Sequence, residues 1–581
     1  METYTVRQLF SSKDKFVIPE YQRAYSWEKT QREQFLEDLR DAENSYFLGH
    51  YLLEKRNEDS DTYYVIDGQQ RMTTIVIFMS CMVHELAKRP SLQGRIKKLR
   101  HTFLYNLDDN QRFHTQNYDD AFFYDEIILR SSENEPDDTL LNTSSKRHIR
   151  HCRQFFDQEL SRASDEALEK WMDLVTNASI TYFEVTDKGE AAQIFAFQND
   201  RGKSLTNIEK LKSFFMLQIF LYGGKQQDDY INRLETSFCD IYQKIATIRT
   251  NEDYVLRYFW MAYSNVGYNT QNTLDEIKKS FKRNGNVSGI NDFVSKLAKA
   301  FAFVAKFEES HEKYCIYLRQ LNNMAWCMPA LIKAYVIANV SPNTMHRLKV
   351  LLENFTFRAM VRGGRASVES RLNRLLINAT NEESVLQNIM SFIDSMRHDY
   401  WNDRQFMDAL NNGYIYNRTK ACSYLLWRYE ETLWAKGYKA NLFNIEKESI
   451  EHIAPQHPRE GECLANGYGA YNDADTPANG IESGEWLSSI GNLMLVSTKH
   501  NSSLGNKNFA DKVKDYGQSN LLMQQKEIHD EFVNQEKPVW DKAEIEKRGK
   551  RIIEKAMEIW NLSNIAEPCC EPLFGLLNLP V

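Results

Sequence analysis

The chain has 581 residues and a formal net charge of −8, and 42% of it is hydrophobic and 26% charged. This composition excludes a largely disordered chain, and its acidic balance argues against a protein that coats DNA without selectivity, although it leaves room for a local basic channel. No apolar run is long enough to span a membrane, and no signal peptide is evident. The nine cysteines are scattered without a CxxC pair, which predicts a reduced, cytoplasmic protein rather than a disulfide framework or zinc site.

Three short strands and a helix are predicted in the first part of the chain. Apolar and β-branched residues favour strands at 16–18, 47–53 and 63–66. Thr30 and Glu33 have the spacing of a capping box, in which each side chain bonds the backbone N–H of the other residue. We therefore expect a helix to begin at Thr30.

Five polar residues at 67–71 separate the third strand from a buried helix that we expect to begin at Met72. A helix N-terminus presents free N–H groups and a positive dipole, which suit a phosphate. Arg71 adds a bidentate donor, Thr73 adds a hydroxyl, and Asp67 could hold a magnesium ion. The alternative is an ordinary Asp-Gly turn before a capped helix, and the residues alone favour neither interpretation.

Two further polar stretches follow. Residues 146–153 are rich in histidine, lysine and arginine; a solvated helix face is the simpler interpretation, and a DNA-contacting face is the alternative. After a strand at 182–185 and a helix at 190–198, Thr206 and Glu209 predict another capping box. Asn199, Arg201, Lys203, Lys210 and Lys212 cluster around this turn. They form either a second wall of a nucleotide pocket or the solvated surface of an ordinary helix-loop-helix.

From about residue 207 to residue 440 the apolar spacing is almost wholly helical. Its aromatic residues are expected in the core. Residues 456–488 predict a long loop, residues 545–560 a closing helix, and residues 562–581 a weak tail.

A carboxylate and an imidazole, Glu451 and His452, stand side by side on a short apolar run that a proline ends. Ile450 and Ile453 favour a strand there, which points Glu451 and His452 to opposite faces. Phosphodiester hydrolysis needs a base to activate water and a divalent cation to hold the phosphate. His452 is the natural base, and the acid beside it is a candidate metal ligand.

A second apolar run starts at Asn492, and Asn501 follows nine positions later. Asn492 would brace the loop between the strands or orient the histidine. Asn501 would supply an oxygen ligand from the start of a helix, and two protein ligands are enough for Mg²⁺, which keeps several waters. Residues 505–514 should form the metal helix and its basic flank. We interpret the whole as a ββα-metal, or HNH-type, nuclease centre; the alternative for the Glu-His pair is a plain strand with one exposed acid.

Several motifs together resemble the GmrSD-type (Type IV) restriction family, whose N-terminal domain also occurs in SspE-like and BrxU-like phage-defence proteins. The N-terminal motifs are IPEYQRAYSW, YFLGHYLL, VIDGQQRMTT and FQNDRGKSLTNIEKLK, and the C-terminal motifs are IEHIAPQ, IGNLMLVSTKHN, GNKNF and RIIEKAMEIW. They recur in order from about residue 4 to residue 560. Met72 replaces a commoner leucine and Glu209 an often-seen aspartate, and neither change removes a reactive group.

The resemblance implies a mainly α fold with α+β parts, divided into four segments. These are a ParB/sulfiredoxin-like nucleotide-binding domain at 1–222, a helical linking domain at 223–440, a His-Me finger nuclease domain at 441–561 and a tail at 562–581. It also implies Mg²⁺ and a nucleoside triphosphate as cofactors. The expected partners are modified phage DNA and the nucleotide, with no membrane, and a homodimer is left open.

The candidate site residues fall into four groups. The nucleotide-binding candidates are Gln22, Arg23, Asp67, Gly68, Gln69, Gln70, Arg71, Thr73, Asn199, Arg201 and Lys210. The catalytic candidates are His452, Asn492 and Asn501, with Glu451 and Asn501 as metal ligands. The DNA-binding candidates are Lys499, Asn506, Lys507 and Lys512. Two alternatives to a nucleotide-regulated endonuclease remain: a DNA- or nucleotide-sensing protein with an inactive nuclease domain, and a regulator of ParB type.

Overall fold

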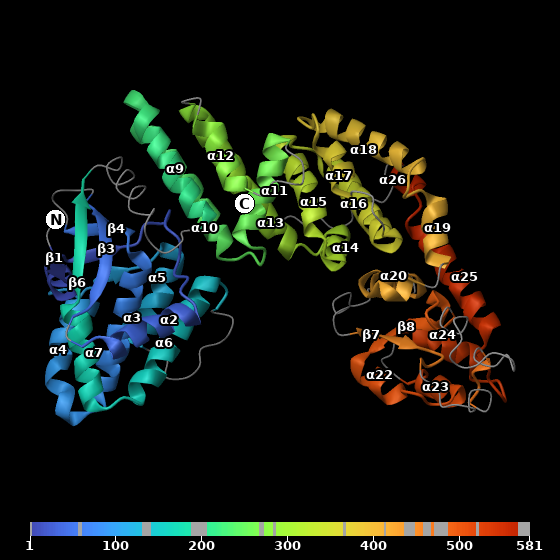
Figure 1. The fold of residues 1–581 in the computed structure, drawn as a ribbon, viewed down its shortest axis with the longest axis horizontal. Coiled ribbons are helices and arrows are strands. Elements are labelled where there is room, and N and C mark those ends of the chain that lie inside the picture. The colour runs from blue at the N-terminus through green and yellow to red at the C-terminus, as the bar shows by residue number, and fades with distance from the viewer. Residues whose placement is uncertain are drawn as a thin grey trace. The chain divides into compact units, whose positions relative to one another are not determined.

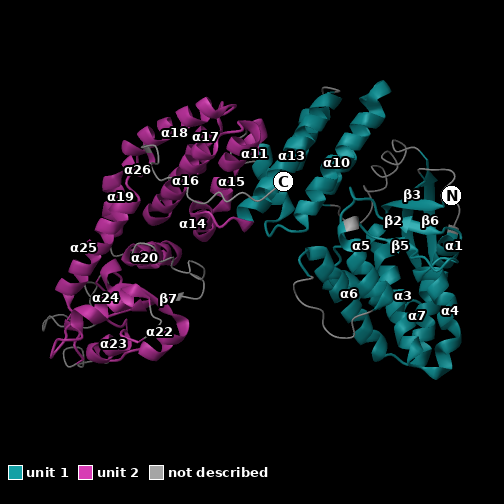
Figure 2. Ribbon diagram, turned by 180° about the vertical axis from the view of Figure 1, so that it is seen from behind, with its two compact units in different colours: residues 1–260, 270–308 teal, residues 261–269, 309–581 magenta. Residues whose placement is uncertain are grey.

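The computed structural model describes most of the chain, and its contacts divide it into two compact units (Figure 2). Unit 1 comprises residues 1–260 and 270–308, and unit 2 comprises residues 261–269 and 309–581. The described residues are 3–43, 45–55, 61–130, 141–186, 206–265, 272–282, 286–363, 368–411, 414–434, 448–456, 466–469, 486–518 and 522–566. The helix predicted at 190–198 and most of the loop predicted at 456–488 lie outside them. The division into four segments stays a prediction.

Unit 1 is built on a six-stranded mixed sheet with the strand order β1-β6-β3-β4-β2-β5 (Figure 1). The strands are β1 (Thr3–Thr5), β2 (Lys15–Val17), β3 (Phe47–Glu54), β4 (Thr62–Asp67), β5 (Phe113–His114) and β6 (Ser179–Val185). β3 pairs parallel with β6 and antiparallel with β4, and β2 pairs parallel with both β4 and β5. The strands predicted in this part of the chain are therefore confirmed as β2, β3, β4 and β6.

The helices of unit 1 are α1 (Val6–Ser11), α2 (Lys29–Asp41), α3 (Gln69–Ala87), α4 (Ile96–Leu99), α5 (Asn117–Phe123), α6 (Ser144–Ser161), α7 (Asp165–Asn177), α9 (Asn207–Tyr222), α10 (Gln227–Ile245), α11 (Glu252–Ser264), α12 (Thr273–Lys282) and α13 (Val287–Glu309), with short helical turns η1 (Pro90–Arg95), η2 (Arg100–Leu104), η3 (Tyr124–Leu129) and η5 (Gly224–Gln226). Those that precede β6 share the buried core of the sheet. The central helix is α3, whose Met72, Val76 and Met79 are fully buried in the unit 1 core. Its first turn therefore has a fixed position at the end of β4.

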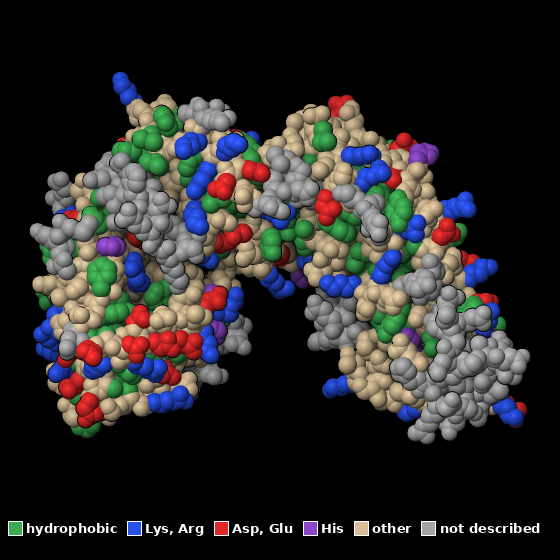
Figure 3. Space-filling view, viewed as in Figure 1, with side chains coloured by type: hydrophobic (Ala, Val, Ile, Leu, Met, Phe, Trp, Pro, Cys, Tyr) green, Lys and Arg blue, Asp and Glu red, His purple; other side chains and the backbone are tan. Residues whose placement is uncertain are grey.

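The basic stretch predicted at 146–153 is part of α6, and two of its four lysine and arginine side chains pair with an acid. Arg150 and Arg153 both pair with Glu126, at 3.4 and 3.2 Å. On the face shown in Figure 3, acidic and basic side chains alternate over α2 and α6. This arrangement favours a structural and solvated face over a DNA-contacting one.

Unit 2 continues the helical pattern and ends in a small sheet. Its helices are α14 (Lys313–Leu321), α15 (Met324–Ile332), α16 (Pro342–Arg362), α17 (Val368–Leu376), α18 (Glu382–Arg397), α19 (Asp403–Asn411), α20 (Thr419–Leu433), α22 (Thr498–Leu504), α23 (Phe509–Asp515), α24 (Met523–Phe532), α25 (Lys542–Ile559) and α26 (Ser563–Ala566), with turns η6 (Lys333–Ile337), η7 (Tyr414–Asn417) and η10 (Ile490–Asn492). Strands β7 (Glu448–His452) and β8 (Leu493–Ser497) pair antiparallel, and α22 follows β8 directly. The mainly helical character expected from the sequence is confirmed.

Buried polar contacts attach the last helix of this unit to its helical part. Glu353 of α16 is 2% exposed. Its Oε1 atom accepts hydrogen bonds from Tyr424 Oη at 2.6 Å, Arg428 Nη1 at 2.6 Å and Trp560 Nε1 at 2.9 Å. Trp560 directly follows α25, so the C-terminal sheet region is joined to α16 and α20 through a fully engaged carboxylate.

One predicted capping box is confirmed, and two predicted helix boundaries are wrong. The capping box at Thr206 and Glu209 is confirmed by reciprocal bonds of 2.9 and 3.3 Å. The one predicted at Thr30 is wrong, because the helix begins earlier, at Lys29, and Gln31 accepts the N–H of Glu28 at 2.8 Å. The region predicted as one metal helix at 505–514 is a turn followed by α23, since Gly505 with φ +45° ends α22.

The helix predicted from Met72 begins three residues earlier, at Gln69, because Gly68 turns the chain. Gly68 has φ +88°, and a Cβ atom there would lie 2.4 Å from the ring of Tyr51. The polar residues 69–71 thus form the first helical turn rather than a preceding loop. Among the helices that the structure describes, none is both long and apolar enough to cross a membrane.

We predict that Gly68→Ala destabilises unit 1 by roughly 1–3 kcal/mol, because the left-handed backbone is strained with a side chain and the methyl group meets Tyr51. Denaturant unfolding measures the change. Gly94→Ala is the matched control, since a Cβ atom there meets nothing within 4 Å. Equal stability of the two variants would contradict the assigned backbone conformation.

Candidate functional site

His452 ends strand β7 and pairs with Leu493 of β8. The residue is 7% exposed, and the ring of Tyr416 packs edge-on against it, with centroids 4.6 Å apart. Burial and the charge of Lys512 lower the pKa of His452 to about 4. The imidazole is therefore neutral near pH 7, and its Nε2 atom has no hydrogen-bond partner within the described residues. A neutral ring with an unengaged nitrogen is the form that a general base needs.

Asn492 holds the chain that follows His452. Its side chain is fully buried and makes four hydrogen bonds: Oδ1 accepts from Ala454 N at 2.8 Å and Trp540 Nε1 at 3.0 Å, and Nδ2 donates to Ala454 O and Leu487 O, both at 3.1 Å. All of its hydrogen-bonding capacity is used inside the protein. Of the two roles expected for Asn492, this arrangement favours bracing the turn, which makes it a positioning residue.

Gly491, beside it, allows helix α25 to approach the same turn. A Cβ atom on Gly491 would lie 1.9 Å from the carbonyl oxygen of Ile545. Arg548 of α25 is buried and donates to Gly491 O at 2.9 Å and Leu493 O at 2.7 Å. In the Gly491-Asn492 pair, the glycine therefore allows α25 to pack closely, and the asparagine bonds the chain after His452.

Glu451 points away from His452, as strand alternation predicts, and forms a buried ion pair. Lys512 Nζ donates to Glu451 Oε1 at 2.6 Å and also to the backbone oxygens of His452 at 3.0 Å and Ile453 at 3.1 Å. Tyr516 Oη donates to the same Oε1 atom at 3.4 Å. Burial raises the pKa of Glu451 and lowers that of Lys512, while their mutual attraction opposes both shifts.

This ion pair argues against two of the expected roles. Lys512 is fully buried, so its ammonium is not at a surface that DNA can reach. Glu451 has one oxygen committed to Lys512 and Tyr516, and its side chain leaves the strand on the face opposite His452. The structure thus gives Glu451 a structural partner in place of an open ligand position on the imidazole side.

Asn501 lies on α22 and is bonded to the strand that carries His452. Its Nδ2 atom donates to Ser449 Oγ at 2.8 Å and Ile450 O at 3.3 Å. These bonds fix the amide group through its nitrogen. Within the described residues, no hydrogen bond joins Asn501 to His452.

The donor types around β7 and α22 are those of a hydrated Mg²⁺ site: an amide oxygen on Asn501 and an unengaged imidazole nitrogen on His452. No group of three or more His, Cys, Asp or Glu side chains suited to a metal occurs in the described part of the chain. A fit to Mg²⁺ therefore depends on Asn501 and on water ligands.

The other DNA-binding candidates are exposed, as that role requires. Lys499, Asn506 and Lys507 all lie at the surface of α22 and the turn after it. Lys507 Nζ forms an ion pair with Asp515 at 2.8 Å. Lys499 on the first turn of α22 is thus the more available cation of the two.

The second candidate site surrounds the first turn of α3. Gln70 bridges to the loop after β2, accepting from Ser26 N at 2.9 Å and donating to Ala24 O at 3.1 Å. Gln22 from that loop is buried and donates to Ile66 O at 3.0 Å. These two amides use their polar atoms to hold the loop against β4 and α3, so they position the site.

Asp67 and Arg71 flank the same turn. Burial raises the pKa of Asp67, and the charge of Arg71 and a 2.8 Å hydrogen bond from Gly68 N oppose this shift. Arg71 Nη2 donates to His50 O at 2.8 Å, and its guanidinium lies 5.4 Å from the centre of the Tyr51 ring. Gly49 with φ +84° makes room for it, since a Cβ atom there would lie 1.8 Å from Arg71 Nη1.

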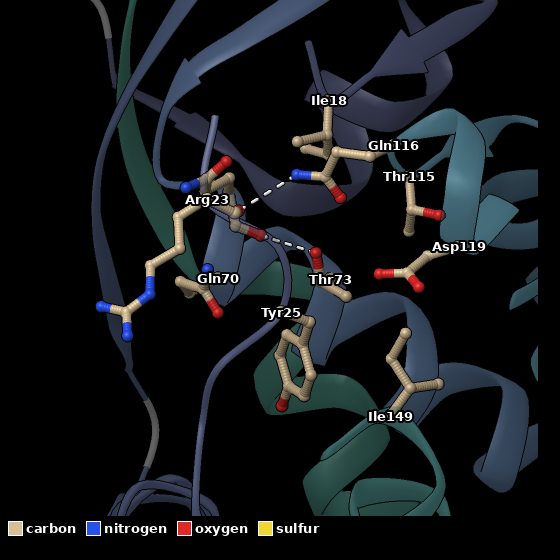
Figure 4. A pocket seen from close by; sticks show the side chains of 10 residues that line it. Ile18, Arg23, Tyr25, Gln70, Thr73, Thr115, Gln116, Asp119 and Ile149 are labelled. Carbon is tan, nitrogen blue, oxygen red and sulfur yellow. Dashed lines mark hydrogen bonds between the residues drawn. The ribbon is translucent and has the colours of Figure 1, made fainter. Parts of the chain in front are cut away.

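A narrow polar hollow lies beside this turn (Figure 4). It is lined by Ile18, Arg23, Tyr25, Gln69, Gln70, Thr73, Thr115, Gln116, Asp119 and Ile149. Three buried oxygens in its wall, Gln69 Oε1, Thr115 Oγ1 and Asp119 Oδ2, have no hydrogen-bond partner within the described residues. Buried polar atoms are rarely left unpaired, which makes this hollow a candidate ligand site. It has no room for a water molecule in this conformation, so a ligand could bond these oxygens only if the walls moved apart.

Sequence reasoning missed Thr115, Gln116 and Asp119, which come from the segment after β5. Gln116 Nε2 donates to Gln22 O at 3.2 Å and Arg23 O at 3.1 Å. The run of polar residues around it, HTQNYDD at 114–120, was the available signal. Only folding brings it against α3.

The remaining nucleotide-binding candidates are less central. Thr73 lies in the hollow, but its hydroxyl donates to Gln69 O at 2.8 Å. Arg23 lies 3.9 Å from Glu209 and 3.7 Å from Glu252. Lys210 is half-buried on α9. Asn199 and Arg201 lie outside the described residues.

Comparison with protein families gives two matches. The N-terminal domain of the GmrSD restriction endonuclease matches residues 6–216, and the C-terminal domain of the GmrSD restriction endonucleases matches residues 401–555. The first match covers strands β2 to β6 with the turn at Gly68, and the second runs from α19 into α25 and includes His452 and Asn501. No curated protein matches the chain.

We predict that Lys512→Met lowers stability by about 3–5 kcal/mol, because the carboxylate of Glu451 is left buried without its partner. Chemical denaturation measures the loss, and Lys514→Met, at an exposed position two residues away, should change stability little. The double variant Lys512→Met/Glu451→Gln should recover most of the stability. If Lys512→Met behaves like Lys514→Met, the buried pair is refuted.

Proposed function

Because this chain belongs to the GmrSD restriction endonuclease family, we propose that it is a metal-dependent DNA endonuclease of Type IV restriction, regulated by a nucleoside triphosphate and directed against modified phage DNA. The observation that carries the nuclease half is the buried, neutral imidazole of His452 at the end of β7, with the Asn501 amide anchored on the same strand. The unpaired polar atoms beside the first turn of α3 support the nucleotide half.

For the hydrolytic step, the imidazole of His452 would accept a proton from the attacking water, since the ring is neutral and its Nε2 atom has no partner among the described residues. A bound Mg²⁺ would hold the scissile phosphate and stabilise its charge. Asn501 would offer its amide oxygen to that ion. Asn492 keeps the backbone after His452 in place. Lys512 donates to the backbone oxygens of His452 and Ile453, so both Asn492 and Lys512 orient the imidazole.

For the nucleotide, the N–H groups at the start of α3 and the Arg71 guanidinium favour a phosphate. Gln69, Thr115 and Asp119 supply the unpaired polar atoms beside them. Gln22, Gln70 and Gln116 hold the walls through bonds to backbone oxygens. Arg71 would thus bind the phosphate, and Gln69, Thr115 and Asp119 would bind another polar part of the nucleotide.

A second candidate function is a DNA- or nucleotide-sensing protein whose nuclease domain is inactive. The observation that favours it is the covering of His452 by Tyr416 together with the low exposure of the imidazole. A protein of this kind would bind DNA without cutting it at any Mg²⁺ concentration.

We predict that His452→Ala lowers DNA cleavage by roughly 10²–10⁴-fold, the usual contribution of a general base, while nucleotide hydrolysis persists. Modified and unmodified phage DNA are incubated with Mg²⁺, with and without each nucleotide, and the products are separated on a gel. EDTA should abolish cleavage by the parent protein. His500→Ala is the control histidine. Full cleavage by the His452 variant would end the assignment of the base, and no cleavage by the parent under any condition would favour the binding protein.

We predict that Arg71→Ala weakens nucleotide binding by about 1.5–3 kcal/mol, because a charge-assisted contact to phosphate is lost. Isothermal titration calorimetry with each triphosphate measures the affinity. Arg95→Ala, an exposed arginine of the same unit, is the control. Unchanged affinity and turnover in Arg71→Ala would remove this residue from the nucleotide site.

A further inference from the structure

We propose that Arg362 and Arg418, in the helical part of unit 2, bind backbone phosphates of DNA next to the His452 centre. This inference rests on the proposed DNA substrate and adds to it a contact outside the predicted nuclease domain. None of the DNA-binding residues expected from the sequence belongs to this part of the chain.

The two guanidinium groups are brought together at the end of α16. Arg362 is the last residue of that helix, and Arg418 precedes α20. Gly363, with φ +55°, lies between them, and a Cβ atom there would be 2.8 Å from Arg418 Nη2. The bare glycine thus lets the Arg418 guanidinium lie against the helix end. Burial lowers the pKa of Arg418; Tyr400 opposes this shift, and the charge of Arg362 adds to it.

No carboxylate neutralises this pair in the described part of the chain. Arg362 donates to the amide oxygen of Gln405 at 2.7 Å, and its Nε atom is buried without a partner. The nearby acids serve other arginines, since Asp403 pairs with Arg358 and Asp399 with Arg371. Two adjacent cations without a counter-ion attract an anion, and guanidinium groups suit phosphate oxygens because of their planar donor fork.

The surroundings match a nucleic-acid backbone better than a small free anion. The Arg362 guanidinium lies 4.3 Å from the centre of the ring of Tyr400, which is 36% exposed. Arg418 follows Tyr416 by two residues, and the Tyr416 ring packs against His452. The cation pair therefore continues the same surface turn that covers the proposed base. On this proposal, a DNA strand whose scissile phosphate reaches His452 runs along this turn toward the two arginines.

The test measures DNA binding in the His452→Ala background, so that cleavage does not interfere. Fluorescence anisotropy with a labelled DNA duplex gives the dissociation constant over a range of NaCl concentrations. Each lost phosphate contact lowers the slope of log affinity against log salt by about 0.9. We expect Arg362→Gln/Arg418→Gln to lower that slope by about 1–2 and to weaken binding most at low salt.

The matched controls separate charge from fold. Arg397→Gln removes an exposed arginine from α18 and should leave the slope unchanged. Arg362→Lys/Arg418→Lys keeps both charges and should retain the slope. If circular dichroism shows that the double glutamine variant is unfolded, Arg418→Gln alone is used, because the Arg418 side chain makes no hydrogen bond to the described residues. The expected change in slope is then about 1.

Two failures are distinguishable. A slope in the glutamine variants equal to that of the parent overturns this inference and leaves the proposed nuclease intact. Absence of DNA binding by the folded parent overturns the DNA substrate and this inference together. Tight binding of inorganic phosphate that is lost in the glutamine variants, combined with an unchanged DNA slope, would assign the pair to a free anion and also overturn it.

Discussion

The arrangement of the C-terminal region depends on one buried ammonium group. Lys512 is fully buried and bonds the Glu451 carboxylate and the backbone oxygens of His452 and Ile453. A cation inside a protein is tolerated only when its donors are satisfied. Here the three acceptors belong to three consecutive residues, so satisfying the ammonium fixes the backbone on both sides of the proposed base. The side chain that looked like a surface cation in the sequence is the internal support of the site.

A second buried cluster attaches the C-terminal sheet region to the helical part of unit 2. Glu353 binds Tyr424, Arg428 and Trp560, and removing any one partner would leave polar atoms unpaired in the interior. Helix α20 carries two of these residues and is preceded by η7, which presents Tyr416 to His452. The Tyr416 ring that packs on the imidazole therefore comes from a turn next to an anchored helix.

Local rules predicted much of the fold, and the reasons for their failures are specific. Thr206 and Glu209 form the expected capping box because both lie at a true helix start, whereas Thr30 lies within a helix that Glu28 and Gln31 begin. Strand alternation correctly separated Glu451 from His452. It could not reveal that a lysine 61 positions later would occupy the carboxylate. Thr115 and Asp119 were missed because their role arises only when the segment after β5 folds against α3.

The two candidate sites place opposite demands on buried polar groups. Around His452, Asn492 and Lys512 have all of their bonding capacity engaged, so the backbone is rigid before any ligand arrives. Around α3, by contrast, one oxygen each of Gln69, Thr115 and Asp119 has no hydrogen-bond partner among the described residues. Unpaired buried polar atoms raise the free energy of the unliganded state, and a ligand that bonds them stabilises the folded unit by mass action. A site of the first kind suits chemistry that needs fixed geometry. A site of the second kind suits a molecule whose binding must change the protein, which is the property required of a regulatory nucleotide.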